Sequence, residues 1–81
     1  MPLRRLGTVD RVAQGLVIVR ADPDADGEDP PEIGTTAVDE SLATVGRVVD
    51  VFGPVARPYL ALDPTEGVDA AGVLGDTVYA R

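Results

Sequence analysis

The most suggestive group of metal-ligating side chains is an acidic stretch in the first half of the chain. Asp22-Pro-Asp-Ala-Asp-Gly27 matches the first six positions of a calcium-binding loop, in which alternating carboxylates surround the ion and glycine permits a sharp turn. The full pattern needs a bidentate Glu at position 12, but that position is Ile33, and Glu32 comes one place early. A Pro-Pro pair also opposes the helix that should leave such a loop. We therefore expect no metal site and interpret residues 22–33 as a solvated acidic loop or insertion.

Groups for nucleophilic or acid–base catalysis are scarce. The chain has no Cys, no His and no Lys, so Ser41 and the threonines lack a neighbouring base that would activate a hydroxyl. A pair of carboxylates can serve as acid and base, but no two acids outside the acidic stretch stand out. We expect a protein without catalytic residues and without a cofactor.

Nucleic-acid binding is the alternative that a small β domain always raises. Such surfaces combine basic residues with stacking aromatic rings, whereas this chain has a net charge of −7, seven Arg and three aromatic residues. Phosphate would be repelled by so acidic a protein. Arg4 and Arg5 form a possible small patch, although a solvated N-terminus is the simpler interpretation. The second hypothesis for the function is a small RNA-binding β-barrel of translation-factor type.

The charge composition and the lack of long apolar runs bear on where the protein works. Every cation is Arg, and ten Asp stand against four Glu, which fits the hydrated acidic surface of a salt-adapted organism. A GC-rich genome would also favour Arg over Lys. The longest uninterrupted apolar run, Leu16 to Val19, is far too short to span a bilayer. We expect a cytoplasmic protein with no membrane partner.

The elements that must position any site are short strands. The 81 residues include 13 Val, nine Gly and seven Pro, a composition typical of a small all-β domain with many turns. Turn signals separate six expected strands, and no window has a convincing helical period. We predict one domain over residues 1–81, a small six-stranded closed or split β-barrel. The expected strands cover 5–13, 16–20, 34–39, 44–52, 58–62 and 75–80, with turns at 14–15 and 63–67.

The segment VFGPVARPY, residues 51–59, interrupts the best strand signal with two prolines. Gly53-Pro54 should stop the strand, and Pro58 restricts Arg57 to extended geometry. The result should be a stiff loop that presents apolar side chains at low entropic cost, as a preorganised protein contact requires. The alternative is that Phe52, Val55 and Tyr59 only close the end of the barrel, and the pattern alone does not decide between them.

Several segments together resemble a known family. RLG at 5–7, QGLVIVR at 14–20, VGRVVDVFGPVARPYLAL at 45–62 and LGDTVYA at 74–80 occur in the order seen in the core domain of the glycine-arginine-rich protein of H/ACA ribonucleoproteins, in its short archaeal form. The resemblance covers nearly the whole chain except the acidic loop. It implies a six-stranded split barrel of the type found in some translation factors.

The resemblance also implies a function and a set of site residues. Members of this family are noncatalytic subunits of the RNA-guided pseudouridine synthase complex, and they bind the catalytic domain of the synthase, a relative of dyskerin. They influence substrate loading and product release in rRNA pseudouridylation and meet guide and substrate RNA only through the complex. The glycine-arginine-rich tails of eukaryotic relatives are absent, so their RNA contacts are not transferred. The residues that match the family's motif, and are predicted to bind the partner, are Val51, Phe52, Gly53, Pro54, Val55, Pro58 and Tyr59.

Overall fold

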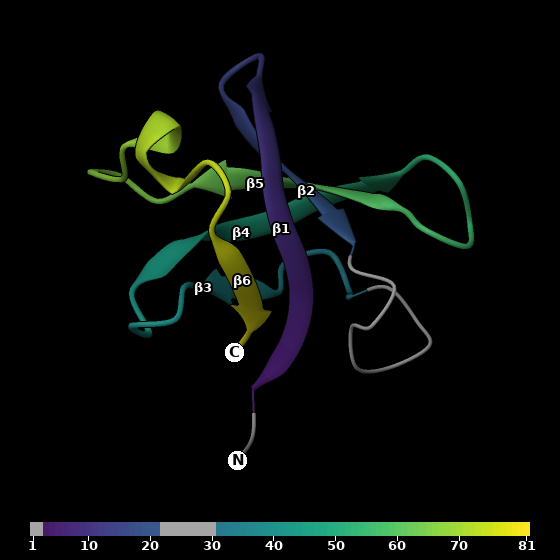
Figure 1. Ribbon diagram of the computed structural model, residues 1–81, viewed down its shortest axis with the longest axis horizontal. Coiled ribbons are helices and arrows are strands. Elements are labelled where there is room, and N and C mark those ends of the chain that lie inside the picture. The colour runs from purple at the N-terminus through teal and green to yellow at the C-terminus, as the bar shows by residue number, and fades with distance from the viewer. Residues whose placement is uncertain (1–2, 22–30) are drawn as a thin grey trace.

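Six antiparallel strands form a closed barrel in the computed structural model, which describes residues 3–21 and 31–81 (Figure 1). Around the barrel the order is β1-β2-β5-β4-β3-β6. The prediction of an all-β, six-stranded barrel is confirmed, and the barrel is closed. The elements are β1 (Arg4–Ala13), β2 (Leu16–Ala21), β3 (Thr36–Val38), β4 (Thr44–Phe52), β5 (Tyr59–Pro64), the 3-10 helix η1 (Ala70–Val73) and β6 (Thr77–Ala80).

The first two strands form the predicted hairpin. Its turn consists of Gln14 and Gly15, whose φ angles are 53° and 77°. Two consecutive positive φ angles match the right-handed twist of a two-residue hairpin, and glycine adopts the second one without steric strain because it has no Cβ. The hairpin extends beyond the rest of the barrel at the top of Figure 1.

The core fills the barrel with aliphatic side chains that alternate along each strand. In β2, Val17 and Val19 are fully buried on the inner face, and in β5 Leu60 and Leu62 take the same role. Branched side chains suit this pleated interior, which explains the abundance of valine. The core cluster is Leu6, Val9, Val17, Val19, Ala37, Val45, Val48, Leu60, Leu62 and Val78.

Strand β5 runs two residues further into the predicted turn than the sequence suggested. Asp63 and Pro64 still pair with Arg47 and Gly46 of β4, so the strand ends at Pro64 rather than before residue 63. Gly46 permits this close pairing because a Cβ there would overlap the carbonyl oxygen of Asp63. Proline at the end of the strand loses no interior ladder bond.

Two other strands are shorter than predicted. β3 comprises only Thr36–Val38, because Gly34 has a φ of 95°, outside the extended range. β6 begins at Thr77 rather than Gly75, whose φ is 83°.

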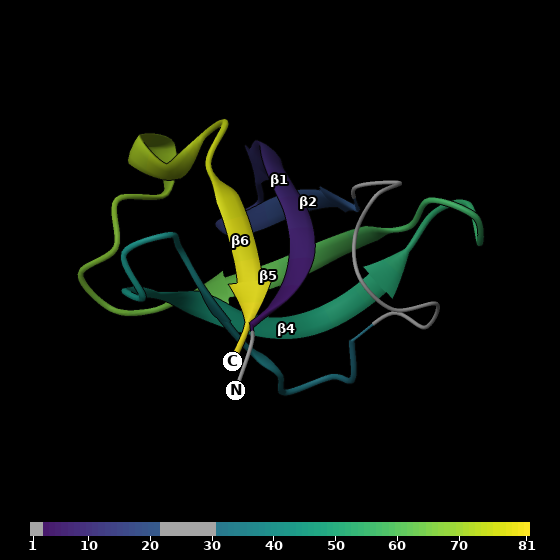
Figure 2. The same cartoon turned by 60° about the horizontal axis from the view of Figure 1, so that its bottom comes forward.

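The N-terminal arginines are not a solvated tail. Arg4 and Arg5 belong to β1, pair with Ala80 and Tyr79 of β6, and are half-buried. Their strand pairing fixes them beside the C-terminal strand, and Figure 2 shows β1 and β6 side by side. Within residues 3–21 and 31–81, no helix has the length and apolar character needed to cross a membrane.

Candidate protein-docking site

The β4–β5 loop, residues 53–58, projects from one end of the barrel at the right of Figure 1. β4 ends at Phe52, as the Gly-Pro pair predicted, and Gly53 turns the chain with a φ of 87°. The amide of Arg57 donates to the carbonyl of Pro54 at 3.1 Å, which closes a tight turn with Val55 at its tip.

Two further hydrogen bonds join this loop to the end of β2. The amide of Ala21 donates to the carbonyl of Pro58, and the Nε of Arg57 donates to the carbonyl of Ala21, each at 3.1 Å. The loop is therefore held at its own turn and at its base. This geometry agrees with the loop that the two prolines predicted.

Val55 is the most exposed large apolar side chain of the described residues, at 99%. A branched aliphatic side chain gains nothing for the fold at such a position, because its apolar area stays in water. Val55 does not close the barrel end, so that alternative does not hold for this residue. Its display on a hydrogen-bonded turn fits a contact that becomes buried only when a partner binds.

Phe52 and Tyr59 stack on one another across the base of the loop. They are directly opposite in the β4–β5 ladder, and their ring centres are 5.6 Å apart with an angle of 20° between the planes. Phe52 is 37% exposed and lies outside the core cluster, so it is not the core residue that the sequence left possible. The pair lies at the base of the loop whose tip carries Val55.

Arg11 lies over the ring of Tyr59. Its guanidinium carbon lies 5.3 Å from the centre of the Tyr59 ring, within the range of a cation–π contact. The guanidinium also bonds Asp10 at 2.7 Å. Local sequence patterns do not predict this contact, because Arg11 and Tyr59 are far apart along the chain and meet only through the strand order of the barrel.

A small apolar cluster lies beneath these side chains on the outside of the barrel. Ile18 alternates with Val17 and Val19, which face the core, so it faces outward; yet it is only 4% exposed. Its partner across the ladder, Ala61, is 3% exposed. Ile18 pairs with Arg11 on its other side, so the outer face carries a covered apolar surface that continues toward the aromatic pair.

The remaining predicted residues divide into exposed and supporting positions. Pro54 is exposed beside Val55, and Pro58 is half-buried at the base of the loop. Val51 pairs with Leu60 and packs against the core cluster, so its side chain supports the loop from inside. The structure thus brings the seven predicted residues into one region, although Val51 does not face outward.

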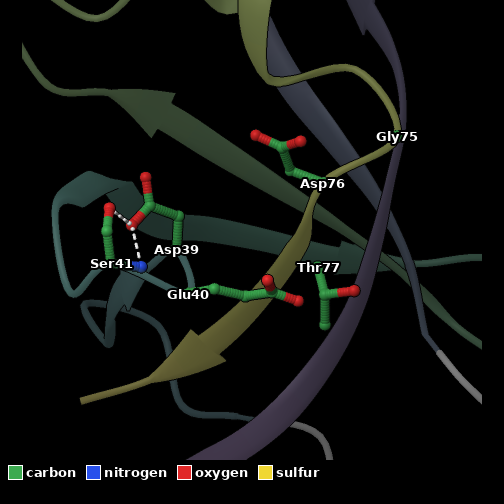
Figure 3. Close-up of a pocket in the computed structure, with 6 residues that line it drawn as sticks. All are labelled: Asp39, Glu40, Ser41, Gly75, Asp76 and Thr77. Atoms are coloured by element: carbon green, nitrogen blue, oxygen red, sulfur yellow. Dashed lines mark hydrogen bonds between the residues drawn. The ribbon is translucent and has the colours of Figure 1, made fainter.

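An acidic cavity at the opposite end of the barrel is the second candidate (Figure 3). It has a volume of about 300 Å³ and contains the carboxylates of Asp39, Glu40 and Asp76. The Oδ1 of Asp39 accepts hydrogen bonds from the hydroxyl and amide of Ser41 and from the amide of Ala43, and these bonds lower the pKa of Asp39. Asp39 therefore organises its own turn.

No metal centre is apparent in the part of the chain that the structure describes. Among residues 3–21 and 31–81, no group of three or more acidic side chains has an arrangement that could hold an ion. The calcium-loop pattern at 22–27 lies outside the described residues. Glu32 and Ile33, which follow it, are both exposed.

Comparisons with known proteins agree with this architecture. An uncharacterised protein of Methanothermobacter thermautotrophicus is 25% identical over 81 residues, covering 95% of this chain and 82% of that protein. A solved structure described as the Gar1 domain of Naf1 matches the fold with a TM-score of 0.71 at 13% identity, covering 99% of this chain and 83% of the other. The family model described as the Gar1/Naf1 RNA binding region matches residues 3–81. The chain therefore belongs to the Gar1/Naf1 family.

Proposed function

We propose that this chain is a noncatalytic protein-binding subunit of the H/ACA RNA-guided pseudouridine synthase complex. It docks on the catalytic domain of the synthase, the dyskerin relative, and aids substrate loading and product release in rRNA pseudouridylation. Guide and substrate RNA are met indirectly through the complex, in the cytoplasm. Membership in the Gar1/Naf1 family supports a role in an RNA-containing complex.

The exposure of Val55 carries the docking part of this proposal. An apolar side chain that is 99% exposed, on a turn closed by its own hydrogen bond and fixed to β2, is preorganised for insertion into a pocket. The stacked Phe52–Tyr59 pair beside it adds aromatic area of the kind that is enriched in interfaces.

Co-purification with the synthase catalytic subunit from the same organism, in high-salt buffer, tests the proposal. Val55→Asp should abolish binding, because a charge would have to enter an apolar pocket. Leu42→Asp is the matched control. Leu42 is, like Val55, an exposed aliphatic side chain in a loop, at 58%, but its loop precedes β4 whereas that of Val55 follows it. Circular dichroism must show that both variants are folded.

The outcomes separate clearly. Binding by the wild type and Leu42→Asp, but not by Val55→Asp, supports docking through the loop. Equal binding by all three proteins would move the interface elsewhere. If the wild type fails to bind a synthase that is otherwise competent, the subunit assignment is wrong.

RNA binding by the barrel itself is the second candidate function, and the family description favours it because it names an RNA binding region. Labelled RNA titrated with the isolated domain at several salt concentrations tests this. Direct binding should weaken steeply as salt rises, since phosphate contacts release counterions.

A further inference from the structure

Three of the seven arginines gather around the docking loop. Arg20 is exposed and lies directly opposite Tyr59 in the β2–β5 ladder, which places both side chains on the outer face. Arg11 covers the Tyr59 ring, and Arg57 belongs to the loop itself. Aromatic and apolar side chains are thus bordered by guanidinium groups on the β1–β2 side and at the loop.

The described residues around the docking loop carry a charge opposite in sign to that of the whole chain. Among residues 3–21 and 31–81, two carboxylates lie in the same region: Asp10 bonds Arg11, and Asp50 accepts a hydrogen bond from the amide of Val51. Three arginines against these two acids give these described side chains a charge of +1, in a protein whose net charge is −7. This region therefore favours a partner surface that carries negative charge.

The arrangement of the rings argues against nucleotide bases as the partner. Phe52 flanks the Tyr59 ring from β4, and Arg11 lies over it from the side of β1. Base stacking needs an open aromatic face, whereas the Tyr59 ring already has Phe52 stacked on it and the Arg11 guanidinium over it. Val55 also needs an apolar pocket, which a sugar–phosphate backbone does not offer.

We propose that the surface formed by Val55, Arg11, Arg20 and Arg57 docks on a protein surface that has an apolar pocket with a rim of carboxylates. The inference rests on the proposed function and specifies the chemistry of the synthase surface. Val55 fills the pocket, and the arginines pair with Asp or Glu side chains at its rim. Charges at a rim mainly raise the rate of association and select the partner.

Isothermal titration calorimetry with the synthase catalytic subunit measures the effect of charge reversal. Arg20→Glu should weaken binding about tenfold at roughly 0.15 M salt, because a carboxylate would then face carboxylates. Arg57→Glu should weaken it at least as much, since it also loses the hydrogen bond to the carbonyl of Ala21. Arg81→Glu is the matched control, since it changes the net charge of the chain equally and lies exposed outside this surface. The difference between the variants and the control should shrink at about 1 M salt, where exposed charges are screened.

Each outcome decides a separate question. If Val55→Asp abolishes binding but Arg20→Glu and Arg57→Glu bind like Arg81→Glu, the acidic rim is wrong and the proposed function stands. If the wild type does not bind the synthase, the proposed function itself fails. If labelled single-stranded RNA binds the wild type and Arg20→Glu reduces that binding while leaving synthase binding unchanged, the arginines serve RNA and the acidic rim is overturned.

Discussion

The guanidinium carbon of Arg11 lies 5.3 Å from the centre of the Tyr59 ring, although the two residues belong to strands that do not pair with each other. β2 separates β1 from β5, and Arg11 reaches across it on the outside of the barrel. The side chain that is crossed is Ile18, which is buried although it faces outward. One arginine thus both contacts the Tyr59 ring of the docking site and lies opposite the buried Ile18.

Replacing Arg11 should destabilise the domain slightly. Arg11→Ala should lower the free energy of unfolding by about 0.5–1 kcal/mol, the size of an exposed cation–π contact, and Arg11→Lys should lower it less. Urea unfolding followed by far-ultraviolet circular dichroism measures this, since the chain has no Trp. Arg81→Ala, at an exposed position, is the control. Equal unfolding free energies for Arg11→Ala and Arg81→Ala would show that the contact contributes nothing.

Gly53 should be needed for docking more than for folding. Its φ is 87°, and a Cβ would lie 3.0 Å from the Cδ2 of Tyr59. Gly53→Ala should therefore cost roughly 1–2 kcal/mol of stability through backbone strain and also displace the ring, weakening synthase binding about tenfold. Titration calorimetry and thermal unfolding would measure the two effects.

Gly67→Ala is the matched control for that substitution. Its φ is 89°, so the backbone strain is similar, but a Cβ there has no neighbour within 4 Å. It should lose stability by a similar amount and bind the synthase normally. Equal loss of binding in the two variants would show that general destabilisation, rather than the position of Tyr59, controls docking.

Most of the fold was predictable from local patterns. Alternating valines and leucines, with turn residues between them, predicted six strands, and Gln14-Gly15 predicted the hairpin. The strand ends were less accurate. Pro64 continues β5 because Gly46, on the neighbouring strand, leaves room for close pairing. Gly46 precedes Pro64 by 18 positions, so local sequence propensity around Pro64 does not include its effect.

The site was only partly predictable, for the same reason. The prolines around Val55 indicated a loop between two strands, and the hydrogen bonds of Arg57 agree. Whether Phe52 faced the core depended on the bulge between Val48 and Asp50, which changes the side of the strand on which the following residues lie. The arginines around Tyr59 depended on the order of the strands around the barrel. Neither the bulge nor the strand order has a signal in a single sequence.

Leu42 has a left-handed backbone conformation, which Asn adopts more readily than Leu. Its φ is 69°, and its side chain is 58% exposed, so the position combines left-handed strain with little burial. Leu42→Asn should raise the free energy of unfolding by about 0.5 kcal/mol, because Asn tolerates this conformation. Leu74→Asn is the comparison: Leu74 is similarly exposed, at 49%, but has an ordinary φ of −56°. Chemical unfolding should show a gain only for Leu42→Asn, and a loss of stability there would refute the strain argument.

The Asp39 turn should respond to acid through one carboxyl group. The hydroxyl of Ser41 donates to Oδ1 of Asp39 at 2.7 Å, and the amides of Ala43 and Ser41 add two more bonds, so the pKa of Asp39 lies below its ordinary value of 3.8. A lowered native pKa stabilises the fold above the unfolded-state value, and this contribution is lost as pH falls through the native value. Ser41→Ala should move the pKa of Asp39 back toward 3.8, because it removes the largest cause of the shift. Ser41→Thr keeps a hydroxyl and should preserve the lowered pKa. Carboxyl carbon chemical shifts followed by NMR during an acid titration measure both variants, and an unchanged Asp39 midpoint in Ser41→Ala would show that the hydroxyl does not hold the charge.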